Sequence, residues 1–160
     1  MEPVGTVEDL FGREYARLVG ALGVAFGDPE AAADAVQDAF IAADRRWAKV
    51  SRYDDPAAWV RRVALNRLRS GRRLGRRRQE ILATVRPVAP ADLTDELLDL
   101  RRALDALPER QRLTVCLFHL AGLKVDEVAA ALEVAPGTVK STLHDARLRL
   151  RAGLEESQHG

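Results

Sequence analysis

Four side chains near the C-terminus combine cationic or polar chemistry with a regular spacing. Lys140, His144, Arg147 and Arg151 follow one another at intervals of four, three and four residues, which places them on one face of a helix. Lysine and arginine bind phosphates and guanine, and a short hydroxyl side chain such as that of Ser141, close by, can bond to base edges. The face therefore suits the major groove of DNA and its phosphates.

Two helices joined by a short turn are predicted to carry this face. Residues 125–132 form the first, and the second begins at Pro136. Each has one apolar stripe at helical spacing: Val125, Val128, Ala129 and Leu132 in the first, and Val139, Leu143, Ala146 and Leu150 in the second. This pattern is typical of a helix-turn-helix, whose second helix reads DNA. The simplest alternative is a pair of amphipathic helices from an ordinary helical bundle.

A second cationic cluster lies in residues 61–78, which contain nine arginines and no acidic residue. Asp55 and Pro56 predict a helix start just before it, because aspartate caps helices and proline favours the first turn. Polar residues then share one face at intervals of three and four: Arg62, Asn66, Arg69, Arg73 and Arg76. Guanidinium groups can hold phosphates while the asparagine amide bonds to a base. The alternative is a solvated charged face, which nine uncompensated arginines disfavour by mutual repulsion.

A third polar face is predicted on the helix that Asp28 and Pro29 begin. Carboxylates and an amide surround one large aliphatic residue there: Asp34, Gln37, Asp38, Ile41 and Arg45. An apolar centre with a polar rim is typical of protein-binding sites. A single exposed isoleucine is also common on ordinary surfaces, so both interpretations stay open.

Charge is segregated along the chain although the net charge of its 160 residues is only +1. Residues 1–60 carry eleven acidic and six basic side chains, whereas residues 61–78 carry basic ones alone. A basic block of this density indicates contact with a polyanion. No run of about twenty apolar residues and no export leader is present, so we expect a cytoplasmic protein without membrane insertion.

Catalytic and metal-binding patterns do not stand out. The single cysteine, Cys116, follows leucines at helical spacing and is expected to be an inert core thiol. The three histidines have no metal-ligand spacing, and there is no phosphate loop, carboxylate pair or nucleophilic triad. We therefore expect no enzymatic activity, no metal and no cofactor.

The predicted helices form two groups. Pro87 and Pro90 stand among small residues and indicate a linker between them. The expected fold is all-α, with two small helical domains joined by a flexible linker: residues 1–78, the linker over residues 79–94, and residues 95–160 with the helix-turn-helix. Gly71 and Gly75 should loosen the end of the arginine-rich helix. Because each domain is small, its core should be thin.

Four motifs in order resemble the signatures of one family. They are DAVQDAF at residues 34–40, AWVRRVALN at residues 58–66, LPERQR at residues 107–112 and GTVKS at residues 137–141. With these four motifs the chain resembles an extracytoplasmic-function sigma factor, the two-domain class of bacterial RNA polymerase specificity subunits. One motif alone would be a weak signal, but the four together span nearly the whole chain.

The resemblance implies a different binding role for each domain. Residues 1–78 would be a region 2-like domain that binds core RNA polymerase and the minus-10 element, and residues 95–160 a region 4-like domain that binds the minus-35 element. The residues implied for core polymerase are Asp34, Gln37, Asp38, Ile41 and Arg45. Those implied for the minus-10 element are Ser51, Arg52, Tyr53, Asp54, Arg62, Asn66, Arg69 and Arg73. Those implied for the minus-35 element are Gly137, Thr138, Lys140, Ser141, His144, Arg147 and Arg151.

The mechanism that the resemblance implies is transcription initiation with melting of the minus-10 element. The loop around Tyr53 would hold a flipped base, since every base has a face that can stack. The linker would let both domains bind one promoter, with a gain from effective concentration. The implied partners are core RNA polymerase and promoter DNA, with an anti-sigma factor as a further candidate.

Four positions depart from the family pattern. Ser70 stands where an acidic residue is usual in the family. Asp145 stands where arginine is usual, and this second departure predicts a shifted preference for the minus-35 sequence. Lys124 and Ala135 replace the serine or threonine that caps the two helices of the helix-turn-helix. Loss of such a cap costs about 1 kcal/mol.

The rival interpretation is a stand-alone helix-turn-helix repressor or activator, whose N-terminal module binds an effector or dimerises. Such a protein would bind duplex DNA without polymerase. A recombinase with a DNA-binding tail is a weaker enzymatic alternative, because no catalytic constellation accompanies the helices.

Overall fold

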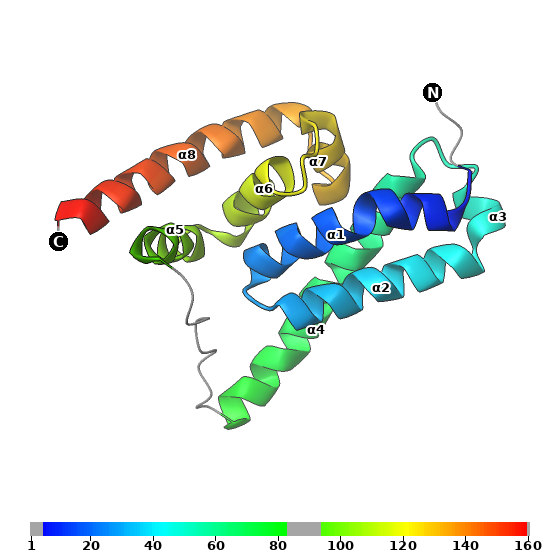
Figure 1. The fold of residues 1–160 in the computed structure, drawn as a ribbon, viewed down its shortest axis with the longest axis horizontal. Coiled ribbons are helices and arrows are strands. Elements are labelled where there is room, and N and C mark those ends of the chain that lie inside the picture. The colour runs from blue at the N-terminus through cyan, green and yellow to red at the C-terminus, as the bar shows by residue number, and fades with distance from the viewer. Residues whose placement is uncertain (1–4, 83–93, 160) are drawn as a thin grey trace.

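The computed structural model describes the backbone of residues 5–82 and 94–159, and their side chains except those of residues 72–82. The described residues fold into helices and loops, which confirms the all-α prediction. The helices are α1 (Val7–Phe26), α2 (Pro29–Arg45), α3 (Trp47–Val50), α4 (Pro56–Leu82), α5 (Asp95–Asp105), α6 (Glu109–His119), α7 (Val125–Leu132) and α8 (Pro136–His159). Figure 1 shows their arrangement. None of them is long and apolar enough to cross a membrane, among the residues described.

Short polar side chains cap the starts of α1, α2, α4 and α5. Thr6 accepts a hydrogen bond from the Asp9 N–H, and the Asp9 carboxylate accepts one from the Thr6 N–H, which completes a capping box. Asp28 accepts from the Ala31 N–H, with Pro29 in the first turn of α2. The start that the sequence predicted at Asp28 is thus confirmed.

The N-terminal group consists of α1, α2 and α4, with the short α3 at one end. The apolar stripes of the three long helices face one another and bury Leu10, Leu18, Leu22, Val36 and Val60. Aromatic rings close the group near the start of α1, where Phe11 stacks on Tyr15 with ring centres 4.4 Å apart. Helix α2 ends at Arg45, and the half-buried Trp47 begins α3.

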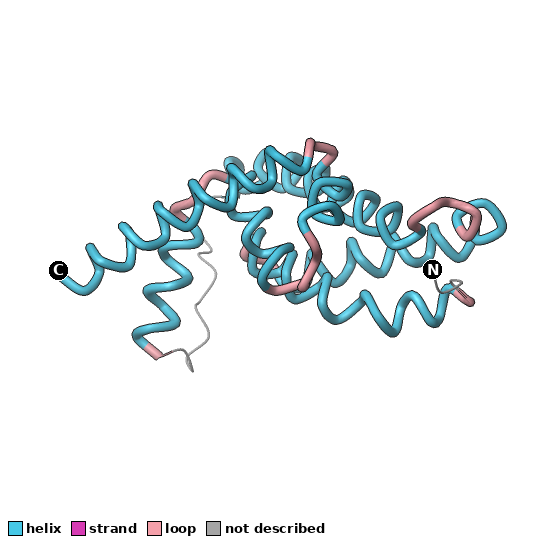
Figure 2. The backbone as a smooth tube through the Cα atoms, turned by 90° about the horizontal axis from the view of Figure 1, so that it is seen from above, coloured by secondary structure: helices cyan, strands magenta, loops and turns pink. Residues whose placement is uncertain are grey.

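The C-terminal group consists of α5 to α8 and contains the predicted helix-turn-helix in α7 and α8. Leu113, Leu117, Val128, Val139 and Leu143 fill its centre. The turn is made by Glu133, which ends α7 in the left-handed conformation with φ of 58°. All of α5 is described, and none of its residues is buried. Figure 2 shows α5 and the second half of α8 projecting beyond the other helices.

The two groups pack directly on each other rather than lying apart. Helix α1 packs on α6, and α4 packs on α7, so one apolar core runs through both groups. Two thin cores gain apolar burial by being joined, which explains why the groups associate. The described chain thus has the two helical groups that the sequence predicted, and these groups pack on each other.

Helix α4 extends beyond residue 78, the expected end of the first domain. Helix α4 continues through Gly71 and ends at Leu82, inside the predicted linker of residues 79–94. A run of strong helix formers, mainly arginine and leucine, outweighs the cost of about 1 kcal/mol for each glycine. Residues 83–93, with Pro87 and Pro90, lie outside the described residues.

Candidate DNA-binding and partner-binding surfaces

The outward face of α2 carries the residues predicted to bind a protein. The five are all exposed: Asp34, Gln37, Asp38, Ile41 and Arg45. Ile41 is 45% exposed although it lies one residue from the buried Phe40. The apolar residues on the opposite side of α2 are buried in the core, so Ile41 lies on the side of the helix that faces solvent. Asp38 also pairs with Arg67 of α4 at 3.6 Å, a contact that links this face to the arginine-rich helix.

The loop between α3 and α4 presents the predicted base-binding side chains. Arg52, Tyr53 and Asp54 are exposed, and Ser51 is half-buried. The buried Val50 anchors the loop, and the Tyr53 N–H donates to the Val50 carbonyl at 3.1 Å. This tight turn holds the Tyr53 ring at the surface, where it is 39% exposed. An aromatic side chain exposed at a surface can stack on a planar group such as a base.

Helix α4 begins as predicted and carries the first part of the arginine ladder. The Asp55 carboxylate accepts a hydrogen bond from the Ala58 N–H at 3.3 Å, beside Pro56 in the first turn. Asn66 is exposed, and Arg62 and Arg69 are half-buried. The predicted Arg73 and Arg76 lie in α4, but their side chains are outside the described residues.

Several arginines of this block are compensated by protein acids, contrary to the expectation that all nine repel one another. Arg62 lies 4.0 Å from Glu133, and Arg67 lies 3.6 Å from Asp38. Arg61 is only 3% exposed and donates two hydrogen bonds to Glu14, at 2.6 and 3.1 Å. The block is therefore partly structural.

Sequence reasoning missed Arg61 and Glu14 as a buried pair, although helical spacing held the signal. Glu14 lies midway between the buried Leu10 and Leu18, four residues from each. On α4, Arg61 lies four residues after the buried Ala57 and four residues before the buried Leu65. Two opposite charges inside apolar stripes predict a buried ion pair, because neither charge could be buried alone.

Arg112 is a second buried arginine that sequence reasoning did not single out. Its Nη1 donates to the carbonyls of Asp105 and Leu107, at 3.2 and 3.1 Å. Its Nε donates to the carbonyl of Ala25 at 2.6 Å, near the end of α1. Arg112 thereby supports the corner between α5 and α6 and also contacts the N-terminal group.

The outward face of α8 carries the other predicted DNA-binding set. Gly137, Lys140, Ser141, His144, Arg147 and Arg151 are exposed, and Thr138 is half-buried. Val139, Leu143 and Ala146 are buried on the opposite face. Arg147 lies over the Phe118 ring, 5.9 Å from its centre, and the exposed Asp145 adds one carboxylate to the solvent-facing part of the helix. The arrangement is a mainly cationic helix surface that a major groove can accommodate.

The starts of α7 and α8 lack the side-chain caps that serine or threonine would supply. At α7 the Glu127 carboxylate compensates, because it accepts a hydrogen bond from the Lys124 N–H at 2.9 Å. At α8 the Ala135 carbonyl accepts from the Thr138 and Val139 N–H groups, but its methyl side chain accepts none. Pro136 occupies the first turn, as predicted.

Cys116 lies in the core, as predicted. Burial raises the pKa of its thiol to about 11, so the thiol stays neutral at physiological pH. The neutral, buried thiol is a poor nucleophile and a poor metal ligand, which agrees with a packing role.

Comparison with known proteins identifies the family. Residues 10–78 match the family model described as Sigma-70 region 2, and residues 97–150 match that of Sigma-70, region 4. The chain is 35% identical to an RNA polymerase sigma-E factor of Streptomyces avermitilis, over 96% of this chain and 84% of that protein. It is 34% identical to the ECF RNA polymerase sigma factor SigM of Mycobacterium tuberculosis, over 89% of this chain and 74% of that protein.

A solved structure extends the similarity to the fold. The sigma factor RpoE from Bartonella quintana, in complex with the anti-sigma factor NepR, aligns with a TM-score of 0.72 at 26% identity. The alignment covers 92% of this chain and 96% of that one, so it includes both helical groups. The family predicted from the four motifs is confirmed: the chain belongs to the extracytoplasmic-function sigma factors of RNA polymerase.

Proposed function

We propose that this sigma factor binds core RNA polymerase through the exposed face of α2, and promoter DNA through α4 and α8. The observation that carries the proposal is the exposure of three polar or charged faces on one set of packed helices. One face has an apolar centre, and the other two are cationic. The domains proposed for these tasks are residues 1–78 and residues 95–160, with residues 79–94 between them.

The α2 face suits a protein partner because Ile41 lies among polar side chains. A protein surface can bury the aliphatic side chain while the rim forms hydrogen bonds, which is how small hot spots gain affinity. Asp34, Gln37, Asp38 and Arg45 form the proposed rim. Core polymerase acts in the cytoplasm, which is the site of action that we propose for this chain.

The α3–α4 loop and α4 are proposed to bind the minus-10 element. Tyr53, held at the surface by the turn, offers a stacking face to an unpaired base. Arg62, Asn66 and Arg69 continue along the adjoining face and suit the phosphates and bases next to it. Ser51, Arg52, Asp54 and Arg73 complete the proposed set.

Helix α8 is proposed to bind the minus-35 element in the major groove. Gly137 and Thr138 lie at its start, where backbone N–H groups and the helix dipole favour a phosphate. Lys140, Ser141, His144, Arg147 and Arg151 follow along the outward face. The chain needs no cofactor for either contact, and we expect no catalytic activity of its own.

An anti-sigma factor is proposed as a further partner. Support comes from the Bartonella quintana protein, which was solved with such a factor and aligns over both groups of this chain. Purification of the chain with its binding proteins from its own cells, at moderate salt, would test this proposal.

The test of the central proposal is complex formation with bacterial core RNA polymerase. Ile41→Asp should weaken association at least tenfold, because it places a carboxylate at the centre of the contact. Val24→Asp is the matched control: Val24 is 41% exposed on α1, close to the 45% of Ile41, and lies outside the proposed site. Gel filtration and fluorescence anisotropy would report association.

Two outcomes would contradict the proposal. Equal association of wild type and Ile41→Asp would remove the α2 assignment. Failure of the wild type to bind polymerase, with tight binding to duplex DNA alone, would favour a stand-alone helix-turn-helix regulator.

A further inference from the structure

The guanidinium of Arg147 lies over an aromatic ring of the neighbouring helix. Its Cζ atom is 5.9 Å from the centre of the Phe118 ring, within the range of a cation–π contact. Helical spacing explains the contact, because Arg147 follows the buried Leu143 by four residues and so lies at the edge of the apolar stripe of α8. Helix α6, which ends just after Phe118, packs on α8. The contact therefore joins the body of the C-terminal group to its proposed DNA-binding face.

The Phe118 ring is itself held in place. It is half-buried near the end of α6 and follows Cys116 and Leu117, which both lie in the core. The His119 ring packs edge-on against it, with ring centres 4.9 Å apart and an angle of 86° between the planes. Aromatic pairs favour this edge-to-face geometry. A ring packed on two sides in this way can support a long, flexible side chain such as that of arginine.

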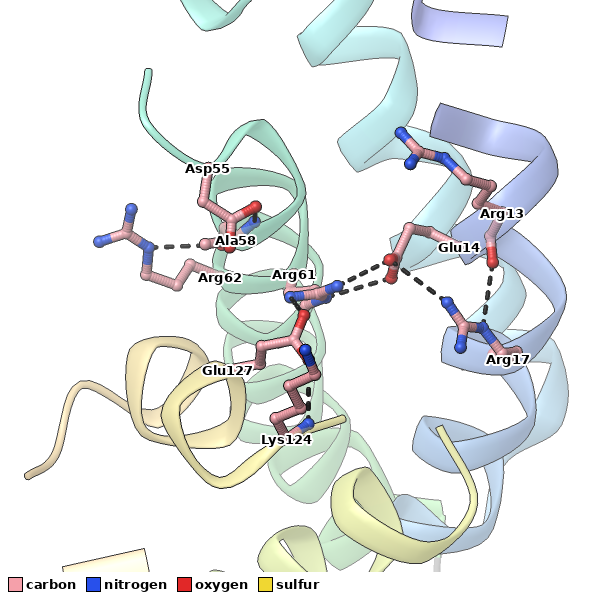
Figure 3. A network of polar contacts seen from close by, with 9 residues as sticks. All are labelled: Arg13, Glu14, Arg17, Asp55, Ala58, Arg61, Arg62, Lys124 and Glu127. Atoms are coloured by element: carbon pink, nitrogen blue, oxygen red, sulfur yellow. Dashed lines mark hydrogen bonds and ion pairs between the residues drawn. The ribbon is translucent and has the colours of Figure 1, made fainter. Parts of the chain in front are cut away.

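Arginines elsewhere in the chain are held by acids, which offset their charge. Figure 3 shows Arg61 of α4 between Glu14 of α1 and Glu127 of α7. Arg147 differs, since within the described part of the chain its guanidinium contacts the Phe118 ring and forms neither an ion pair nor a hydrogen bond. A phenyl ring carries no net charge, so it can orient the cation without neutralising it. The N–H donors of Arg147 thus stay available to an anion.

A phosphate of duplex DNA is the anion that suits this position. Lys140 precedes Arg147 by seven residues, or two helical turns, so both cations lie on the same side of α8 and about 10 Å apart along its axis. A helix in the major groove has a phosphate backbone on each side, and contacts to these phosphates fix its orientation. The two cations are therefore placed to follow one of the two backbones.

We propose that Phe118 is a positioning residue for DNA binding, whose ring holds the Arg147 guanidinium ready to bind a phosphate beside the major groove. The inference rests on the proposed function, because it needs α8 to be a helix that binds duplex DNA. An unsupported arginine loses rotamer freedom when it binds, whereas a guanidinium already stacked on a ring loses less. The gain in DNA affinity should be that of an exposed cation–π contact, about twofold to fivefold.

Phe118→Leu tests the ring, because leucine keeps the half-buried site apolar and removes the aromatic face. Affinity for a mixed-sequence duplex should fall about twofold to fivefold at about 0.1 M salt, measured by fluorescence anisotropy. Phe118→Tyr keeps the ring and should retain the affinity of the wild type. Phe11→Leu is the matched control, since it makes the same substitution at a ring on α1 that is 42% exposed and outside the proposed DNA-binding surfaces. Circular dichroism would verify that each variant is folded.

A double-mutant cycle separates positioning from a general structural role. In an Arg147→Ala background, Phe118→Leu should cause no further loss of DNA affinity, because the side chain that the ring holds is already gone. A ring that only stabilised α6 would cause the same loss in both backgrounds. Additive losses in the double variant, or wild-type affinity in Phe118→Leu, would overturn the inference.

Nuclear magnetic resonance of the free protein gives a readout that needs no DNA. The ring current of Phe118 should shift the side-chain protons of Arg147 upfield in the wild type and in Phe118→Tyr, and this shift should be lost in Phe118→Leu. Equal Arg147 shifts in the wild type and Phe118→Leu would overturn the inference, because the ring would then not hold the guanidinium.

Lys140→Ala keeps failure of the inference apart from failure of the proposed function. Wild-type DNA affinity in Arg147→Ala, beside a loss in Lys140→Ala, would overturn the inference alone, since α8 would still bind DNA. Wild-type affinity in both variants would contradict the proposed role of α8 and overturn the inference with it.

Discussion

The two helices proposed to bind DNA, α4 and α8, use their cations differently. In α4, Arg61 is buried against Glu14 and Arg67 pairs with Asp38, so part of the charge stabilises the protein. In α8, Lys140 and His144 are exposed on the outer face and form no ion pair within the described part of the chain. The number of cationic residues in a sequence is therefore a poor measure of DNA-binding capacity. Burial and pairing with protein acids decide which cations can still contact DNA.

The largest expected effect concerns the structural charge in α4. Glu14→Ala should lower the free energy of unfolding by about 3–5 kcal/mol, because the buried Arg61 loses both of its hydrogen bonds. Urea unfolding followed by circular dichroism would measure the change. The matched control is Glu133→Ala, which removes the acidic neighbour of the adjacent Arg62 at an exposed position and should cost under about 1 kcal/mol.

A double variant tests whether stability depends on the ion pair itself or only on filling the buried space that the pair occupies. Glu14→Leu combined with Arg61→Met replaces two charges by apolar side chains of similar volume, and it should recover much of the stability lost in Glu14→Ala. Equal losses for Glu14→Ala and Glu133→Ala would break the comparison, since buried and exposed pairs would then contribute alike.

Local patterns predicted most of the architecture and the exposed faces. Asp28 and Asp55 indicated two helix starts, and apolar spacing placed Ile41 and Lys140 on outer faces, because both signals act within a few residues. The roles of these faces stay predictions. The Glu14–Arg61 pair joins residues 47 positions apart, so the sequence signalled two buried charges without identifying their partners.

The packing of the two groups could be predicted least. It depends on contacts such as Arg112 with the Ala25 carbonyl, 87 positions apart. A backbone carbonyl has no residue type, so no sequence pattern identifies it as a partner. The thin core expected for each small domain was the available hint that the groups would gain by sharing one.

An intermediate effect is expected on DNA affinity, where α8 should dominate in the free protein. Lys140→Ala should lower affinity for a mixed-sequence duplex about fivefold to tenfold at 0.1 M salt, and flatten the log–log salt dependence by about 0.9 for a lost phosphate contact. Arg62→Ala should have a smaller effect on both quantities, because Glu133 lies 4.0 Å from Arg62 and offsets part of its charge.

Fluorescence anisotropy across a salt series would measure both variants. Arg102→Ala supplies the control, as Arg102 is exposed on α5 and outside both proposed surfaces. Equal slopes for Lys140→Ala and wild type would remove the α8 phosphate contact. Equal losses for Arg62→Ala and Lys140→Ala would show that the two helices contribute alike to the free protein's DNA binding.

The smallest expected effects concern how the two helices begin. The Asp55 carboxylate caps α4, whereas Ala135 leaves the start of α8 without a side-chain acceptor. Ala135→Ser should raise the free energy of unfolding by about 1 kcal/mol, and Asp55→Ala should lower it by a similar amount, because each change adds or removes one capping bond. Thermal unfolding would report the two shifts with opposite signs.

A serine hydroxyl is expected to stabilise the protein only at the start of a helix, so a serine placed inside a helix serves as the control. Ala130→Ser introduces the same group at an exposed site inside α7, where serine is a weaker helix former than alanine and should slightly lower the melting temperature. A gain for Ala135→Ser beside a loss for Ala130→Ser isolates the cap. Because Ala135 is not one of the residues proposed to contact the minus-35 element, the salt dependence of DNA binding should stay that of wild type. A lower melting temperature in Ala135→Ser would mean that Pro136 and the Ala135 carbonyl already satisfy the start of α8, and that the two helices differ in their charges alone.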